Sequence, residues 1–208
     1  MAFEYPVNLD LAGRAVVVFG GGPLARERIA RLLEVGAEVT VVTPDDPGVG
    51  NRVDHHARLG TPADLDGVFL AIATGEDDAP IDELFAAAER AGVVFASVDD
   101  VEHSHFGAAS TIRRGDLQLT ISTAGKAPAL SKRLRIELED RFDDAYGELV
   151  EVLHGARQRL LPRTVPFADW AAAWGAALAD LDGLLELIRD GQAGVAEERV
   201  VSIVRESL

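Results

Sequence analysis

The chain contains no cysteine in its 208 residues. This absence excludes disulfides, thiolate metal sites and a cysteine nucleophile. The sequence also has no uninterrupted apolar run of about 18 residues, the length needed for a membrane-spanning helix. Its first residues lack the basic segment that begins a signal peptide. We therefore expect a cytoplasmic protein with no membrane partner.

Positive charge is scarce, and lysine is scarcest. The formal net charge is −15 and the sequence pI about 4.6, which argues against nucleic acid as a partner. The two lysines, Lys126 and Lys132, both lie in the segment 111–136, whose local net charge is +5. Such a run usually forms a solvated helix face. A cationic cluster in an acidic protein can also hold an anionic ligand, and the charge pattern leaves both interpretations open.

Glycines follow the first apolar run of the chain. Residues 15–19 are apolar, three glycines begin at Gly20, and a second apolar run covers 38–43. This order predicts strand, glycine turn, helix and strand, the first half of a dinucleotide-binding unit. Gly20 would make the tight turn, and Gly22 would let the backbone approach a pyrophosphate. The helix N-terminus then offers free N–H groups to the phosphates.

The alternation of strands and helices continues to about residue 106. Apolar runs at 67–73 and 93–98 predict two more buried strands, and 82–91 predicts an amphipathic helix between them. Strands joined by helices form parallel sheets. We therefore expect one doubly wound parallel sheet over residues 1–106.

A different pattern follows that domain. Residues 109–113 and 117–123 predict a hairpin, and helical periodicity begins near residue 130 and continues to the end, with helices around 170–188 and 195–208. We divide this part into a dimerisation and substrate segment, 107–145, and a helical region, 146–208. A hairpin with a helical tail covers its own apolar surface poorly, so we expect a homodimer.

Three stretches together resemble the precorrin-2 dehydrogenase and sirohydrochlorin ferrochelatase family, the N-terminal module of siroheme synthase. They are the turn Gly-Gly-Gly-Pro-Leu-Ala-Arg-Glu-Arg from Gly20, Ser-Val-Asp-Asp from Ser97, and Ile-Ser-Thr-Ala-Gly-Lys-Ala-Pro-Ala-Leu from Ile121. The resemblance implies an α/β, Rossmann-like doubly wound parallel sheet, then a hairpin-plus-helices dimerisation region and a helical tail. It also implies NAD-dependent oxidation of precorrin-2 to sirohydrochlorin in siroheme or heme biosynthesis. Some members insert ferrous iron too, which makes Fe²⁺ a candidate substrate.

The resemblance also implies roles for individual residues. Asp99 takes the place of the essential aspartate, where it would accept the proton that leaves with the hydride. Without the resemblance, an aspartate after a strand is more often a cap. The tetrapyrrole substrate would meet residues of the basic segment, namely Arg113, Arg114, Thr123 and Lys126. Ala124 and Ala127 depart from the family, which usually has glycine and serine there.

Two further sets of candidates remain. The nucleotide is expected at Gly20, Gly22, Pro23, Leu24, Pro44, Asp45 and Thr74. No arginine closely follows the second strand to take a 2′-phosphate, so NAD is preferred to NADP. His103 and His105 could ligate or deliver a metal, or act as acid and base, although two imidazoles without a third ligand are more often surface histidines.

Two other functions use some of the same features. A non-catalytic dinucleotide-sensing regulatory domain would need the glycine turn without turnover, but not the basic segment. Such a sensor would also carry glycine at position 25, where this chain has Ala25, and an acid at the end of the second strand. A paralogue that delivers metal or tetrapyrrole without redox chemistry is the third possibility.

Overall fold

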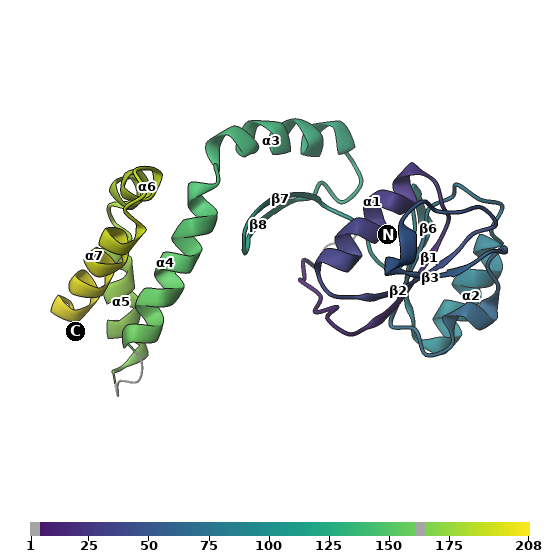
Figure 1. The fold of residues 1–208 in the computed structure, drawn as a ribbon, viewed down its shortest axis with the longest axis horizontal. Helices are drawn as coiled ribbons and strands as arrows, with labels where there is room; N and C mark the ends of the chain where they lie inside the picture. The colour runs from purple at the N-terminus through teal and green to yellow at the C-terminus, as the bar shows by residue number, and fades with distance from the viewer. Residues whose placement is uncertain (1–4, 161–164) are drawn as a thin grey trace. The chain divides into compact units, whose positions relative to one another are not determined.

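The computed structural model describes residues 5–160 and 165–208 (Figure 1). The chain divides into two compact units, Met1–Ala108 and Ala109–Leu208. The finer division of the second unit at residue 145 stays a prediction. In the part of the chain that the structure describes, no helix combines the length and apolar character needed to cross a membrane.

The first unit is built on a six-stranded sheet. Its strand order is β3-β2-β1-β4-β5-β6, parallel from β3 to β5, with β6 antiparallel to β5. The predicted doubly wound parallel sheet is confirmed, and β6, which the sequence did not predict, adds one antiparallel strand at its edge. The strands are β1 (Ala15–Phe19), β2 (Glu38–Val42), β3 (Asp54–His56), β4 (Leu70–Ala73), β5 (Val94–Ser97) and β6 (Asp100–Ser104).

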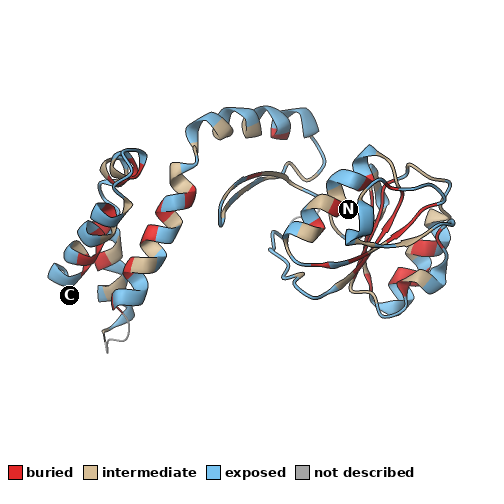
Figure 2. Cartoon of the chain, in the orientation of Figure 1, coloured by how far each residue is buried: buried red, intermediate tan, exposed pale blue. Residues whose placement is uncertain are grey.

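Two helices cover the sheet because its central strands are apolar on both faces. Val16 and Val18 of β1 pack with Ile29 of α1 (Pro23–Glu34) in one core. Val17 and Phe19 belong to a second core, which includes Leu84 of α2 (Ile81–Ala91). Figure 2 shows the strands as the buried centre of this unit. An uninterrupted apolar run is what a strand covered on both faces requires. Two short 3₁₀ turns, Gly50–Arg52 and Pro62–Leu65, complete the unit.

The register of the sheet brings three strand ends to one edge. Phe19 of β1 pairs with Ala73 of β4, and Ala73 pairs with Ser97 of β5. The chain order reverses between the neighbours β1 and β4. In doubly wound sheets the crevice beyond the carboxyl ends of such strands is where ligands bind.

The second unit combines a hairpin with helices. Strands β7 (Ser110–Arg114) and β8 (Leu117–Ile121) form the predicted antiparallel hairpin. Five helices follow among the described residues: α3 (Pro128–Arg141), α4 (Ala145–Leu160), α5 (Phe167–Ala177), α6 (Leu181–Arg189) and α7 (Ala193–Glu206). The expected helical stretch 170–188 is two helices, because Asp180 caps the N-terminus of α6 by accepting from Gly183 N. Helices α4 to α7 share one apolar core.

The hairpin packs closely against the start of α4. A Cβ on Gly147 would lie 2.8 Å from the backbone carbon and oxygen of Arg114. Backbone cannot move aside as a side chain can, so Gly147→Ala should cost about 1–3 kcal/mol of stability. Gly175→Ala in α5 is the matched control, since a Cβ there meets nothing within 4 Å. It should instead gain about 0.5–1 kcal/mol from helix propensity. Thermal or urea unfolding measures both, and shifts of the same sign would contradict this packing.

Candidate functional site

The turn that follows β1 has no room for side chains. Gly20 has a φ of +125°, and a Cβ there would overlap the Thr74 hydroxyl. Thr74 Oγ1 lies 3.3 Å from the carbonyl oxygen of Phe19, so the ends of β4 and β1 are held together. A Cβ on Gly21 would lie 2.9 Å from Thr43 Oγ1, a fully buried hydroxyl without a hydrogen-bond partner among the described residues. Thr74 therefore leaves no space for a side chain at Gly20, and Thr43 leaves none at Gly21.

A carboxylate lies against the N-terminus of α1. The backbone N–H groups of Leu24 and Ala25 donate to Glu76 Oε1 and Oε2, each at 3.0 Å, and Thr74 Oγ1 lies 3.0 Å from Oε2. A Cβ on Gly22 would overlap this carboxylate. Desolvation raises the pKa of Glu76, but these hydrogen bonds outweigh it and the pKa is lowered overall. Glu76 is therefore an anion held where a helix N-terminus favours one.

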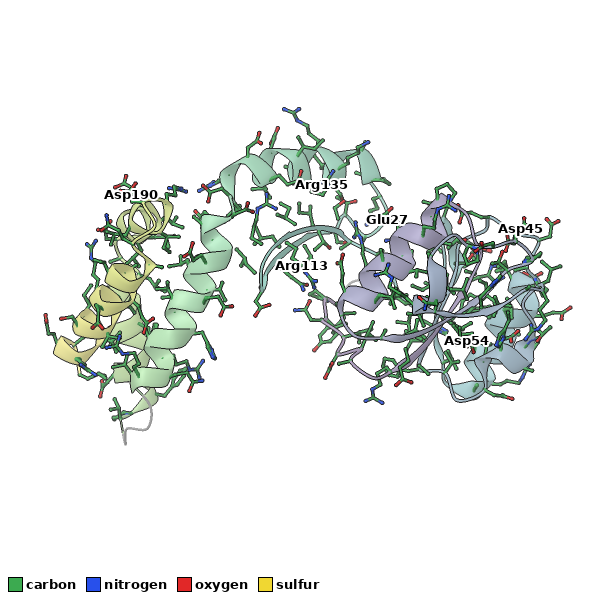
Figure 3. All side chains as sticks on the ribbon, viewed as in Figure 1. Glu27, Asp45, Asp54, Arg113, Arg135 and Asp190 are labelled. Atoms are coloured by element: carbon green, nitrogen blue, oxygen red, sulfur yellow. The ribbon has the colours of Figure 1, made fainter. Side chains whose placement is uncertain are left out.

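The predicted nucleotide residues gather at this edge of the sheet. Gly20, Gly22, Pro23 and Leu24 form the turn and the first residues of α1, and Thr74 follows β4. Pro44 and Asp45 are exposed after the end of β2, the strand beside β1. Figure 3 labels Asp45 among the side chains of this unit. The arrangement offers helix-terminal amides and close backbone at one place, which is what a pyrophosphate needs.

Glu76 was missed in the sequence. Its partner Leu24 is 52 residues away in the chain. Glu76 also belongs to the segment Gly-Glu-Asp-Asp, residues 75–78, and such a segment after an apolar strand is typical of a solvated loop. The available signal was its place in the chain, because it follows the strand beside β1 by three residues. Carboxyl ends of neighbouring parallel strands meet at one edge.

Asp99 lies in the tight turn between β5 and β6, at the same edge of the sheet. Its φ is +62°, a left-handed conformation that non-glycine residues rarely adopt. Asp99 is exposed to solvent. Ser104 stabilises the turn: its hydroxyl accepts from Ser97 N at 2.9 Å and donates to the carbonyl oxygen of Asp100 at 2.6 Å. Backbone strain of this kind persists where the surroundings fix it, and it recurs at functional sites.

Asp100, the residue after Asp99, is hydrogen-bonded within β6. Its carboxylate accepts from the backbone N–H of Glu102 at 3.1 Å and of His103 at 3.2 Å. It also contacts His103 Nδ1 at 2.6 Å. Asp100 therefore fixes the start of β6, directly after Asp99.

The two candidate histidines have carboxylate partners. His103 Nε2 lies 3.0 Å from Asp82, and His105 Nε2 lies 2.5 Å from Glu89. The ring of Phe85 packs against both imidazoles. In the residues the structure describes, no group of three or more histidine, aspartate or glutamate side chains is placed to hold a metal ion. A role for these histidines in handling metal stays a prediction.

The basic segment lies in the second unit, where Figure 3 labels Arg113 and Arg135. Several of its charges are paired: Arg133 contacts Glu137 at 2.8 Å, and Arg135 contacts Glu139. Arg114 donates to the carbonyl oxygen of Glu139 at 3.1 Å, which ties the hairpin to α3. The +5 counted over 111–136 thus overstates the available charge, because the partner glutamates lie just beyond that window. Exposed cations remain at Arg113, Lys126 and Lys132.

The loop before α3 has an unusual backbone. Thr123 Oγ1 accepts from Ala127 N at 3.1 Å and lies 3.3 Å from the Ser131 hydroxyl. Ala124 has a φ of +52°, a conformation that favours the glycine usual at this position in the family that the sequence resembles. Thr123 therefore shapes the loop that presents Lys126.

Comparisons with known proteins agree with this geometry. Residues 7–110 match the family described as "Putative NAD(P)-binding", and residues 114–141 match "Sirohaem biosynthesis protein central". The chain is 28% identical over 211 residues to a siroheme synthase of Photorhabdus laumondii, covering 97% of this chain and 44% of that protein. It is 33% identical over 188 residues to siroheme synthase 2 of Aeromonas hydrophila, covering 87% and 40%. The chain thus spans less than half the length of these curated relatives.

A solved structure extends the comparison to the whole fold. The chain is similar to SirC, precorrin-2 dehydrogenase, with a TM-score of 0.66 and 24% identity. The match covers 98% of this chain and 100% of the other. The α/β unit with its helical tail is therefore a known architecture.

The pair of Asp100 and His103 predicts a pH dependence of the turn. The hydrogen bond to Asp100 raises the pKa of His103, and the same bond lowers the pKa of Asp100. A raised histidine pKa stabilises the fold below the unfolded value of about 6.5, and this contribution is lost as the pH rises through the folded pKa. We expect Asp100→Asn to lower the pKa of His103, measured by NMR titration. Asp82→Asn, which removes a weaker charge interaction, should lower it less. Equal effects would contradict the assigned pairing.

Proposed function

The chain belongs to the family of NAD(P)-binding modules of siroheme synthases and precorrin-2 dehydrogenases, and we propose that it oxidises precorrin-2 to sirohydrochlorin with NAD. One observation carries the proposal. The glycine turn and the carboxylate of Asp99 lie at the same edge of one sheet, beyond the ends of β1 and β5. A hydride acceptor and a proton acceptor are the two groups that this oxidation requires.

The residues at the glycine turn fit a dinucleotide. The amides of Leu24 and Ala25 already hold an anion, the Glu76 carboxylate, which takes the space over Gly22 that a Cβ would otherwise occupy. When bound, NAD would supply the hydride acceptor. Pro44 and Asp45 would flank the adenosine ribose, and Asp45 is the acid nearest the end of β2 that could accept from its hydroxyls. The absence of an arginine close behind this strand supports NAD over NADP.

Asp99 would act as the base. Oxidation of the macrocycle removes one hydride and one proton, which leaves NADH and a protonated carboxylate that then releases its proton to water. Asp99 is exposed, so its carboxylate is accessible to a substrate at this edge of the sheet. Asp99 has a left-handed backbone conformation in the turn after β5, at the edge where doubly wound sheets bind their ligands.

The second unit would bind the substrate's carboxylates. Arg113 and Lys126 are exposed cations, and Thr123 shapes the loop that carries Lys126. Arg114 is a weaker candidate, since its guanidinium already bonds Glu139 and lies 3.4 Å from Asp144. A cationic cluster within an acidic protein would draw an anionic tetrapyrrole to this surface.

A homodimer forms part of the proposal. Helix α3 buries Ser131 alone among its residues, and it exposes Leu130 at 50% and Ile136 at 42%. Figure 2 shows this helix as largely exposed. A helix that buries so little of itself within its own chain can be covered by a second copy. Insertion of ferrous iron as a second substrate stays a prediction, for which Asp99 could take the displaced pyrrole protons.

The first test replaces the proposed base. Asp99→Asn keeps the size of the side chain and tolerates the left-handed backbone, so it removes the base without adding strain. We expect turnover of precorrin-2 with NAD to fall about 10²–10⁴-fold, followed by NADH absorbance, with NAD affinity nearly unchanged. Wild-type turnover in this variant would contradict the role of Asp99. NAD binding without turnover in the native protein would instead favour the sensing domain.

The second test reverses single charges in the basic segment. Lys126→Glu and Arg113→Glu should raise the KM for the tetrapyrrole strongly and leave NAD affinity unchanged. Arg157→Glu, an exposed position on α4, is the matched control and should do neither. The difference should shrink as salt rises, because screening shortens the reach of exposed charges to about 10 Å at 0.1 M. Identical behaviour of all three variants would reduce the segment to a solvated face.

A further inference from the structure

Glu76 occupies the place that the nucleotide site needs. Its two carboxylate oxygens accept from Leu24 N and Ala25 N, and they fill the space over Gly22. Helix α1 has no acidic residue in its first turn, and its N-cap, Gly22, has no side chain. The anion at this helix end therefore comes from the loop that follows β4, across the point where the strand order reverses.

A pyrophosphate would use the same amides and the same space. Backbone N–H groups at the first turn of a helix bind phosphate oxygens, and glycine lets the phosphates approach the backbone. A carboxylate presents a negative charge and paired acceptor oxygens, so it mimics one phosphate at this place. Two anions cannot share these donors, because like charges at hydrogen-bond distance repel strongly.

The loop around Glu76 permits its departure. Glu76 itself is half-buried, and its neighbour Gly75 is exposed with a φ of +70° and open space around the position of a Cβ. The hydroxyl of Thr43 is buried beside Gly21 and has no hydrogen-bond partner among the described residues. The glycine turn thus holds both a displaceable anion and a buried hydroxyl.

We propose that Glu76 is an internal competitor for the pyrophosphate of the dinucleotide: it caps α1 in the free protein and must leave for the nucleotide to bind. The inference rests on the proposed nucleotide site. The apparent dissociation constant of a ligand rises by the inverse of the fraction of protein that is open to it. A cap closed in about nine molecules of ten would weaken nucleotide binding roughly tenfold. The same carboxylate would help to displace NADH after hydride transfer.

The test measures NAD affinity and stability in the intact chain. We expect Glu76→Ala and Glu76→Gln to tighten NAD binding in calorimetry, about tenfold for the alanine variant. The nucleotide-free alanine variant should also melt at a lower temperature than the native protein, because two amides of α1 lose their acceptor. Asp78→Asn is the matched control. Asp78 is exposed and lies two residues after Glu76, so the substitution removes the same charge and should change neither quantity.

The outcomes separate this inference from the proposed function. Equal or weaker NAD binding in the Glu76 variants, with normal binding in the native protein, would overturn the competitor role and leave the nucleotide site standing. Equally tightened binding in Asp78→Asn would also overturn it, since the effect would then be one of net charge. Absence of NAD binding in the native protein and in every variant would refute the nucleotide site itself, and the competitor with it.

Discussion

The close approach of the ends of β1 and β4 is the constraint on which this unit depends. Thr74 stands where a Cβ of Gly20 would be, and Glu76 stands where a Cβ of Gly22 would be. The parallel register fixes this meeting, because Phe19 and Ala73 are paired neighbours. The glycines are therefore set by contacts inside the protein before any ligand is considered. The same absence of side chains leaves backbone amides available to a phosphate once Glu76 moves.

A second set of contacts shapes the acid at the neighbouring strand end. Asp99 takes a left-handed conformation that costs free energy, and Ser104 offsets this cost with hydrogen bonds to Ser97 across the turn and to the carbonyl oxygen of Asp100. Since β6 runs back antiparallel from this turn, the carboxylate is held on a hairpin instead of a flexible loop. The two adjacent aspartates thus differ in kind: one is exposed at the tip, and the other is part of the support.

In the first unit, sequence patterns predicted the strands whose residues are apolar and missed the two strands whose residues are mostly polar. The runs that became β1, β2, β4 and β5 are buried on both faces, so composition alone identifies them. The edge strands β3 and β6 contain Asp-His-His and Asp-Val-Glu-His-Ser, and they pair through backbone that carries no such signal. Glu76 was missed for a related reason, since its partners are amides distant in sequence. Local spacing predicted the glycine turn, and the family resemblance singled out Asp99, whose role stays a proposal.

In so acidic a chain, an anionic ligand has to be held by donors in direct contact with it. With a net charge of −15, the overall field repels an anionic ligand, so short-range donors must hold it. At α1 these donors are amides that an internal carboxylate already satisfies. At α3 the first turn has no acidic residue and no side-chain cap, and the exposed cation Lys126 lies two residues before its first residue, Pro128. One helix end thus carries its own anion, whereas the other lies beside an exposed positive charge. Under the proposed function, a dinucleotide would compete with Glu76 at the first helix end, and the substrate's carboxylates would meet Lys126 beside the second.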